Sequence, residues 1–268
     1  MCMRLHHGDC LDVLKDIEDG SVDLIVTSPP YAERRKKQYG GISTEKYVDW
    51  FLPISNELKR ILKPTGTFIL NIKEHCEDGE RSDYVLRLIL ALKESGWRWT
   101  EEYIWHKKTA APGKWPNRFR DAWERLLQFN KEKKFNMYQE AVMVECGDWV
   151  KAINSRKPTK AELVRHNSSN NSGFGTKDSN WIGRDEVFPS NVLHLAGVTN
   201  NVGHPAVFPK AIPEFFVKLF TQENDVVLDP FMGSGTVGIV CKELKRDFIG
   251  IDKNINYCEL SKQRIEAS

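Results

Sequence analysis

Short apolar runs alternate along the chain with longer stretches in which apolar residues recur every three or four positions. The runs at 22–26 (VDLIV) and 67–72 (TFILNI) are typical of buried strands, and the stretches at 43–66 and 82–97 have helical spacing. The same alternation returns over 209–267. Strands that alternate with helices predict an α/β fold with a doubly wound, mostly parallel sheet.

The helix predicted at 43–66 carries its own start and stop signals. Ser43 or Thr44 is a suitable N-cap, and 63–66 (KPTG) should end the helix. Pro53 lacks a backbone N–H, so we expect it to kink this helix or to divide it into two.

Two further strands, predicted at 100–108 and 123–131, should pair as a hairpin, after which the pattern is lost. Residues 131–192 contain a long stretch rich in Asn, Ser and Gly without periodicity. Regular α/β structure resumes afterwards, so this region is an insertion rather than a linker. We therefore expect one domain built from 1–130 and 193–268, interrupted by 131–192.

Composition and the N-terminal sequence indicate the cellular compartment of the protein. Of the 268 residues, 40% are hydrophobic and 28% are charged, as in globular proteins with an apolar core. No run approaches the roughly 20 apolar residues of a membrane helix, and the N-terminal residues lack a signal peptide. We expect a cytoplasmic protein with no membrane partner. The six cysteines are scattered without a CxxC pair, which argues against disulfides and against a metal site.

Positive charge is concentrated in one region although the net charge is only +2. Residues 107–165 hold fourteen Lys and Arg against seven Asp and Glu, with aromatic residues interleaved. A solvated surface with some core aromatics would explain this pattern. The alternative is a nucleic-acid face, where cations contact phosphates and aromatic rings contact bases.

A glycine-rich turn follows the strand predicted at 225–230 (DVVLDP). Gly233, Gly235 and Gly238 have the spacing of a dinucleotide-binding turn, in which the first two let the backbone approach a ligand and the third permits close helix packing. The next strand ends in Asp252, where a carboxylate can bind both hydroxyls of a ribose. Turn, helix, strand and terminal acid in this order predict a site for an adenosine-containing ligand.

The residues before the glycines narrow the choice of ligand. Asp229, Pro230 and Phe231 lie between the strand and the turn, whereas nicotinamide enzymes usually run the strand directly into the glycines. A carboxylate near a helix N-terminus disfavours a pyrophosphate. It suits a cationic ligand without phosphate, such as S-adenosylmethionine.

The motifs TSPPY (27–31) and DPFMGSGT (229–236) together resemble the amino-group DNA methyltransferases, which methylate exocyclic nitrogens of cytosine or adenine. The order of motifs, with TSPPY first and the cofactor loop near the end, is similar to the β class. This resemblance implies a circularly permuted, seven-stranded, Rossmann-like methyltransferase sheet. It also implies that the insertion is a target-recognition region, with DNA contacts beginning near residue 107.

The resemblance implies a set of residues around S-adenosylmethionine. Phe231 and the glycines would line the cofactor, Asp252 would bind its ribose, and Asp9 would contact its adenosine side. For Lys210 a plain helix start is an almost equal alternative. The full expected set is Asp9, Thr27, His204, Pro205, Phe208, Lys210, Asp229, Phe231, Gly233, Ser234, Gly235, Thr236 and Asp252.

The hook formed by Ser28, Pro29, Pro30 and Tyr31 is the expected catalytic segment. An aromatic amine is a weak nucleophile because its lone pair is delocalised into the ring. The Ser28 hydroxyl and the Pro29 carbonyl can accept its N–H bonds and localise that pair, and the prolines fix the direction of the carbonyls. Tyr31, expected to be exposed, would stack on a base that has left the duplex.

The expected partner is double-stranded DNA, contacted by Arg34, Arg35, Lys36, Lys37, Lys114, Arg118 and Arg120. The resemblance also allows a homodimer and a cognate restriction endonuclease that acts on the same site. Serine at the first hook position favours cytosine-N4 as the methylated atom. Adenine-N6 is the nearest alternative. A nicotinamide-dependent oxidoreductase and a DNA-binding module with a decayed cofactor site are more distant ones.

Overall fold

The computed structural model describes residues 2–33, 41–109, 116–155, 159–160, 183–197 and 208–268. His204, Pro205, Arg34, Arg35, Lys36, Lys37 and Lys114 lie outside this described part. The chain forms two compact units. The larger unit comprises Met1–Tyr138 and Asn191–Ser268, and the smaller comprises Gln139–Ser190.

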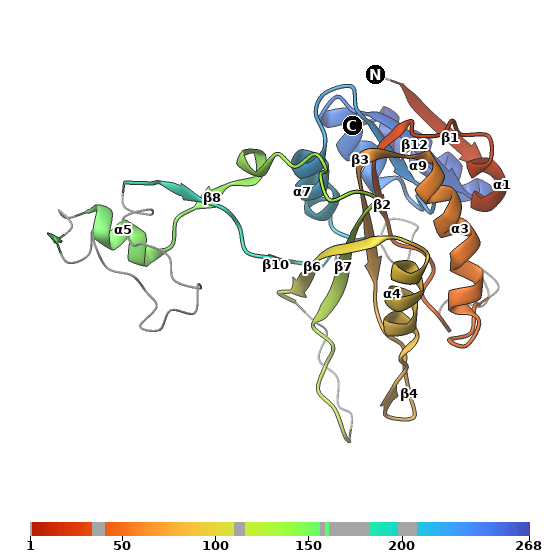
Figure 1. Cartoon of the computed structure of the whole chain (residues 1–268), viewed down its shortest axis with the longest axis horizontal. Coiled ribbons are helices and arrows are strands. Elements are labelled where there is room, and N and C mark those ends of the chain that lie inside the picture. The colour runs from red at the N-terminus through yellow and green to blue at the C-terminus, as the bar shows by residue number, and fades with distance from the viewer. Residues whose placement is uncertain (1, 34–40, 110–115, 156–158, 161–182, 198–207) are drawn as a thin grey trace. The chain divides into compact units, whose positions relative to one another are not determined.

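An eight-stranded sheet runs through the larger unit (Figure 1). Its order is β1 (Met3–His7), β12 (Asp247–Asp252), β11 (Val226–Asp229), β2 (Val22–Thr27), β3 (Leu62–Ile72), β7 (Trp123–Asn130), β6 (Arg98–Lys107) and β10 (Val192–Leu195). Only β7 is antiparallel to its neighbours in this sheet, which confirms the predicted mostly parallel arrangement. Seven strands were expected, and the eighth is β10, which adds in parallel to β6 at the edge.

Helices cover both faces of the sheet, which confirms the doubly wound architecture (Figure 1). One layer contains α1 (Cys10–Leu14), α3 (Tyr47–Ile61) and α4 (Tyr84–Glu94), and the other contains α7 (Ala211–Phe220), α8 (Thr236–Glu243) and α9 (Ile255–Glu266). Every residue of β2 is buried. A strand covered on both faces needs a continuous apolar run rather than an alternating one, and the sequence shows such a run at 22–26.

Helix α3 differs from its prediction at both ends. It is continuous through Pro53, and it begins after Lys46, with no side-chain cap from Ser43 or Thr44. The buried side chains of Tyr47, Phe51, Ile54 and Leu58 hold the helix together across the proline. The chain passes directly into β3 at Leu62, so the expected stop sequence 63–66 already lies in the strand.

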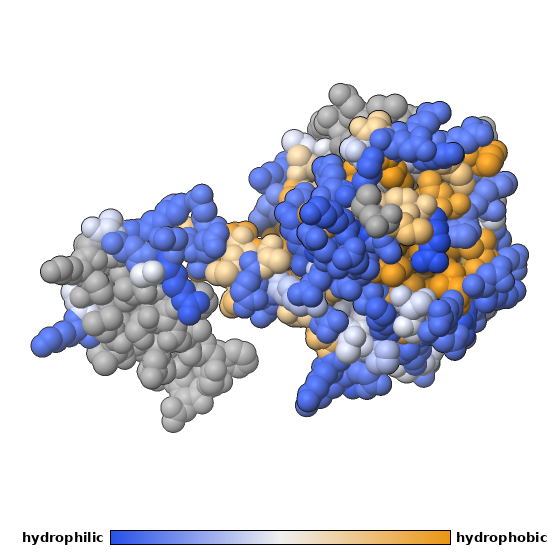
Figure 2. Space-filling model, turned by 90° about the horizontal axis from the view of Figure 1, so that it is seen from above, coloured by the Kyte–Doolittle hydropathy of each residue, from blue (hydrophilic) through white to orange (hydrophobic). Residues whose placement is uncertain are grey.

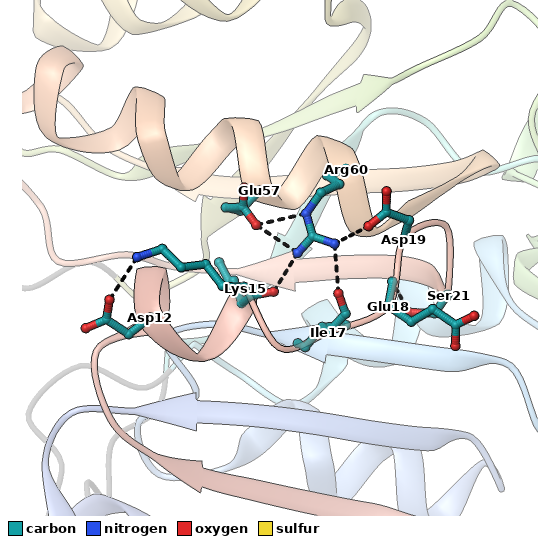
Figure 3. Close-up of polar contacts among 9 residues, drawn as sticks. Asp12, Lys15, Ile17, Glu18, Asp19, Ser21, Glu57 and Arg60 are labelled. Carbon is teal, nitrogen blue, oxygen red and sulfur yellow. Dashed lines mark hydrogen bonds and ion pairs between the residues drawn. The ribbon is translucent and has the colours of Figure 1, made fainter.

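Arg60 fastens the end of α3 to the segment between α1 and β2 (Figure 3). Its guanidinium donates to the carbonyls of Leu14 and Ile17, both at 2.8 Å, and also binds the carboxylates of Glu57 and Asp19. The bond to Glu57, followed by that to Asp19, raises the pKa of Arg60 above its usual value. These bonds connect the end of α3 to the end of α1 and to the segment that leads into β2.

Two hairpins extend from the edge of the sheet at which β3 and β6 end. The predicted pairing of β6 with β7 is confirmed, and a short hairpin of β4 (Cys76–Glu77) and β5 (Glu80–Arg81) follows β3. Asp121 joins the two hairpins, because Arg81 and Lys73 both contact its carboxylate. These cations lower the pKa of Asp121 although burial alone would raise it.

The smaller unit contains a 3₁₀ turn (Gln139–Val142), a β8–β9 pair (Val144–Glu145 with Glu186–Val187) and α5 (Asp148–Asn154). Among the side chains of this unit whose burial is described, Cys146 is the one buried hydrophobic residue. Its described surface is coloured mainly hydrophilic in Figure 2, whereas the larger unit shows an apolar area among polar ones. In the described parts of the chain, no helix has the length and apolar character needed to cross a membrane.

Candidate active site

The chain changes direction across the sheet between β11 and β2. The connection from β11 leads through α8 to β12 on one side, and the connection from β2 leads through α3 to β3 on the other. Ligands of open α/β sheets bind at the carboxyl ends of strands where such a reversal occurs. Here these ends carry Asp229 and Thr27, and the Thr27 hydroxyl donates a hydrogen bond of 2.7 Å to Asp229 Oδ1.

Asp252 draws the end of β12 against the glycine turn. Its Oδ2 accepts a bond of 3.0 Å from the backbone N–H of Gly233, and its Oδ1 accepts one of 2.8 Å from that of Asn254. The carboxyl group is buried, and this burial raises its pKa above the usual range. The acid and the turn, predicted from sequence order alone, therefore lie in direct contact.

Gly235 and Gly238 are both required because a side chain at either position would meet a neighbouring element. Gly235 has a φ of +78°, and a Cβ there would lie 2.7 Å from the Cβ of Ser261 on α9. A side chain at Gly235 would therefore meet α9, which is a packing requirement for glycine in addition to the predicted one, that the backbone can approach a ligand. A Cβ on Gly238 would lie 2.5 Å from Ile265 Cδ1 and 2.8 Å from Phe248 Cε1, which confirms its role in close helix packing.

Asp229 is a buried carboxyl group with no cation among its contacts in the described structure. It is 2% exposed, and its two hydrogen bonds, from Thr27 and from the Phe231 N–H, both fall on Oδ1. Burial raises the pKa of Asp229 to about 7, against the lowering effect of these bonds. The nearby Thr236 Oγ1 is buried without a hydrogen-bond partner. A ligand with a positive charge and polar atoms would satisfy both groups.

The hook follows directly from β2 and is fixed by a buried tyrosine of α3. Ser28 is half-buried and Pro29 is buried. The Tyr47 hydroxyl donates a bond of 2.9 Å to the Pro30 carbonyl. This bond uses the carbonyl after the one that was predicted to face the substrate amine, and together with the two rigid proline rings it sets the direction of the hook.

Tyr31 is not the exposed ring that the sequence suggested. It is half-buried and packs against the hydrophobic core. Its hydroxyl contacts Ser28 Oγ at 3.3 Å, Asn71 Oδ1 at 3.2 Å and Glu124 Oε2 at 2.8 Å. Burial, and then the charge of Glu124, raise the pKa of Tyr31 well above its usual value.

Sequence reasoning missed Asn71, Lys107 and Glu124. Glu124 lies in β7, is 7% exposed and forms an ion pair of 2.5 Å with Lys107 of β6. The Asn71 amide, at the end of β3, donates to Glu124 Oε2 and to the Arg125 carbonyl. The available signal was an acidic residue near the start of the predicted strand 123–131, but nothing in the sequence indicated which residues it would contact.

The comparisons with known proteins agree with this site. The model of a family described as DNA methylase matches residues 22–263. The chain belongs to this DNA methylase family. The type II methyltransferase M.PvuII of Proteus hauseri is 30% identical over 277 residues, covering 96% of this chain and 82% of that protein. M.HpaI of Haemophilus parainfluenzae is 29% identical over 272 residues, covering 100% of this chain and 75% of that one.

Comparison with solved structures shows that the fold of the methylase is also similar to those of known DNA methyltransferases. A PvuII DNA methyltransferase described as cytosine-N4-specific superposes with a TM-score of 0.74 at 26% identity, covering 98% of this chain and 86% of that one. The complex of M1.HpyAVI with SAM has a TM-score of 0.60 at 22% identity, covering 98% of each chain. The resemblance to β-class amino DNA methyltransferases is thus confirmed, and the nicotinamide interpretation is wrong.

Four other predicted cofactor residues of the methylase are among the residues that the structure describes. Asp9 caps α1 by accepting from the Leu11 N–H at 2.9 Å, and it is exposed. Phe231 packs against Trp50, with ring centroids 5.8 Å apart. Ser234 is buried and Phe208 is half-buried.

Lys210 lies apart from the glycine turn. Its ammonium binds the carboxylate of Glu243 at 2.6 Å. Glu243 ends α8, whereas the turn precedes Thr236 at the start of the same helix. At 1.5 Å per residue, the two ends of α8 are about 10 Å apart. The structure therefore favours the alternative of a plain helix start for Lys210.

The predicted DNA contacts that can be described lie in the loop between β6 and β7. Arg118 is half-buried and contacts Asp121 at 3.3 Å, and Arg120 is exposed. Phe119, between them, is 93% exposed. The methylase thus presents two guanidinium groups and an aromatic ring on the loop of the β6–β7 hairpin, whose second strand carries Glu124.

Proposed function

We propose that the protein transfers a methyl group from S-adenosylmethionine to the exocyclic N4 of a cytosine that is flipped out of duplex DNA. The single observation that carries this proposal is the bond between Thr27 and Asp229. It joins the hook strand to the cofactor strand at the point where the sheet reverses. Membership of the DNA methylase family supplies the reaction class.

Residues on two strands, on the glycine turn and at the start of α8 would hold the cofactor, which supplies a methyl group on a positively charged sulfonium. Asp252 would accept bonds from the ribose hydroxyls with the lone pairs that remain beside its two backbone bonds. Asp229 would be ionised by the positive charge. The buried Thr236 hydroxyl offers a further polar contact. Phe231 would contribute an apolar wall, and the Gly233 backbone would approach the ligand.

The hook would prepare the amine for attack. Ser28 Oγ and the Pro29 carbonyl accept its two N–H bonds, which pulls the nitrogen toward tetrahedral geometry and localises its lone pair. Because the proline rings fix the hook in advance, no reorganisation is needed when the base arrives. The half-buried Tyr31 ring would lie beside the base and offset part of the cost of unstacking it.

Serine at position 28 and the cytosine-N4 specificity given for the PvuII enzyme favour cytosine over adenine. The test is enzymatic digestion of DNA treated with the protein and S-adenosylmethionine, followed by chromatography of the nucleosides. N4-methylcytosine is the expected product. Detection of N6-methyladenine would instead show that the methylated position is adenine-N6. The absence of any methylated nucleoside would refute the proposed activity.

DNA would lie against the basic residues Arg34, Arg35, Lys36, Lys37, Lys114, Arg118 and Arg120. The insertion at 131–192 would select the target sequence, with 1–130 supplying catalysis and 193–268 the cofactor site. As in a restriction–modification pair, an endonuclease would share the target, and a homodimer would be the assembled form. These partners imply action on cytoplasmic DNA of a bacterium or phage. Methylation-sensitive sequencing of DNA from an expressing host would report the target.

A further inference from the structure

A continuous set of hydrogen bonds leads from the hook into the sheet. Ser28 Oγ donates to the Tyr31 hydroxyl at 3.3 Å, and Tyr31 donates to Glu124 Oε2 at 2.8 Å. The residues come from the end of β2 and the start of β7, more than ninety positions apart in the case of Tyr31 and Glu124. Nothing in the cofactor site described above accounts for this arrangement.

The direction of the bonds follows from counting protons. A tyrosine hydroxyl has one proton, and it lies within reach of two acceptors, Asn71 Oδ1 at 3.2 Å and Glu124 Oε2 at 2.8 Å. The shorter bond, to a carboxylate, is the stronger one. With its proton directed to Glu124, Tyr31 can receive only the proton of Ser28. The lone pairs of Ser28 Oγ are then left for the substrate.

Glu124 is held in place as an anion. Lys107 neutralises it through Oε1 at 2.5 Å, and the Asn71 amide donates to Oε2 at 3.3 Å. With 7% exposure, the carboxylate cannot turn toward water to leave this position. Tyr31, whose pKa is raised by burial and then by Glu124, keeps its proton and remains a donor. Glu124 can therefore only accept from Tyr31, and Tyr31 can only donate to Glu124 and accept from Ser28.

We propose that Glu124 is a positioning residue for methyl transfer, which holds Ser28 as a pure acceptor toward the amine and takes up the proton that the amine releases. This inference rests on the proposed function. It adds a residue of β7 to the residues of the hook that serve the reaction.

The proposed step conserves atoms and charge. The amine nitrogen forms a bond to the methyl carbon of S-adenosylmethionine, the carbon–sulfur bond breaks, and its electron pair stays on sulfur. One N–H proton passes to Ser28 Oγ, the Ser28 proton passes to Tyr31, and the Tyr31 proton passes to Glu124. Glu124 ends neutral beside Lys107, and between turnovers the proton returns through Tyr31 to the half-buried Ser28, and from Ser28 to water once the product has left.

The test compares variants that differ in charge and in size. Glu124→Gln keeps the size but removes the charge, and its amide can donate to Tyr31 and reverse the chain. Glu124→Asp keeps the charge but is shorter. Tyr31→Phe breaks the chain without touching the ion pair with Lys107. Glu102→Gln is the matched control, since Glu102 also pairs with a cation in this hairpin, namely Arg125.

Single-turnover transfer of tritiated methyl to unmethylated plasmid DNA is measured for each variant, with cofactor affinity measured by calorimetry. We expect Glu124→Gln and Tyr31→Phe to slow transfer by about 100-fold with unchanged cofactor affinity. Glu124→Asp should retain more activity than Glu124→Gln, and Glu102→Gln should resemble the wild type. The double variant Tyr31→Phe with Glu124→Gln should be no slower than either single variant, because both break one chain.

A second readout needs no activity. In protein labelled with ¹³Cζ-tyrosine, the Tyr31 signal, assigned by its loss in Tyr31→Phe, should shift in Glu124→Gln and not in Glu102→Gln. Suppose that the wild-type protein methylates DNA but Glu124→Gln is as fast as Glu124→Asp, or faster. This result would overturn the role of Glu124 and leave the proposed function intact. A wild-type protein that leaves DNA unmethylated would overturn the proposed function itself.

Discussion

Asp229 couples cofactor binding to protonation at the scale of a single residue. Without a cation, the folded protein holds this carboxyl group in its neutral form up to about pH 7, because burial raises its pKa to that value. A cationic ligand favours the anion, so binding must release a proton at lower pH. We therefore expect the affinity for S-adenosylmethionine to rise as pH increases through about 7.

Replacing Asp229 by Asn should stabilise the ligand-free protein at pH 8 and weaken cofactor binding. The folded-state pKa exceeds the unfolded one, so the folded state binds more protons between about pH 4 and 7. Stability is lost as pH rises through that window, by on the order of 4 kcal/mol for a shift of this size. An Asn Oδ1 can keep both bonds made by Asp229 Oδ1.

The measurement is urea unfolding of both proteins at pH 5 and pH 8. We expect the difference in free energy of unfolding to be much larger at pH 8. A difference that is the same at both pH values would show that Asp229 does not titrate in this range.

Ser28 and Asp252 should separate catalysis from binding. Ser28→Ala removes an acceptor for the amine, so it should lower the turnover rate by about 100-fold and change the cofactor dissociation constant little. Asp252→Ala removes the acid beside Gly233 and should chiefly weaken cofactor binding. Steady-state kinetics and calorimetric titration would distinguish the two. Full turnover in Ser28→Ala would exclude its proposed role.

How far the sequence predicted the site depended on how local each interaction is. Ser28, Asp229 and Asp252 stand in or next to short motifs at strand ends, and parallel strands bring their carboxyl ends together. Glu124 could not be found, because its importance comes from contacts with Tyr31 and Lys107 that only the strand order creates. Tyr31 was misjudged for the same reason, since its exposure depends on β7.

At the scale of elements, the turn before α8 depends on close approach to α9. Gly235→Ala would place a Cβ 2.7 Å from Ser261 Cβ at a φ of +78°. Gly20→Ala is the matched control, because Gly20 has a φ of +60° and nothing within 4 Å of its Cβ position. The control should lose about 1–2 kcal/mol of stability from the backbone alone.

Gly235→Ala should lose more than this, and it should also weaken cofactor binding because the turn must shift. Thermal unfolding of both variants, with and without S-adenosylmethionine, measures the two effects. Equal losses in the two variants would mean that α9 yields to the added methyl group.

The basic segment after the hook is expected to act through phosphates. Charge reversal of Arg34, Arg35, Lys36 and Lys37 should weaken DNA binding and reduce the slope of log affinity against log salt, by about 0.9 for each phosphate that the protein no longer neutralises. Fluorescence anisotropy at several salt concentrations gives both quantities. Reversal of four other exposed lysines, Lys15, Lys93, Lys245 and Lys262, changes the net charge by the same amount and serves as the control. An unchanged slope in the variant of the basic segment would exclude a role in binding phosphates.

Periodicity predicted helices and strands well where burial is regular. It placed the strands that became β2 and β11, and it identified the β6–β7 hairpin. It misjudged α3, because tertiary packing of Tyr47 and Phe51 outweighs the local effects of Pro53 and of the candidate caps. β10 was missed, since four residues are too few to show a period and its partner β6 is distant in sequence.

At the scale of the whole molecule, the chain leaves the larger unit after Tyr138 and returns to it at Asn191, and the backbone of both residues is hydrogen-bonded within the larger unit. The Tyr138 N–H donates to the Leu219 carbonyl at 2.7 Å, and the Asn191 carbonyl accepts from Ile104 at 2.8 Å. Replacing Gln139–Ser190 by a Gly-Ser linker should therefore preserve the sheet and cofactor binding but abolish methylation of specific sites. Calorimetry and tritium incorporation test this. Loss of cofactor binding would show that the two units fold as one.

The position of β12 between β1 and β11 has a consequence for synthesis on the ribosome. Of the strands in this sheet, β1 is translated first and β12 last, so β1 has no hydrogen-bonding partner until every other strand of the sheet has been made. Asp252 arrives with β12. The cofactor crevice is thus completed only with the last strand of the sheet, and a nascent chain whose hook is already made but which lacks β12 has no means of modifying the DNA around it.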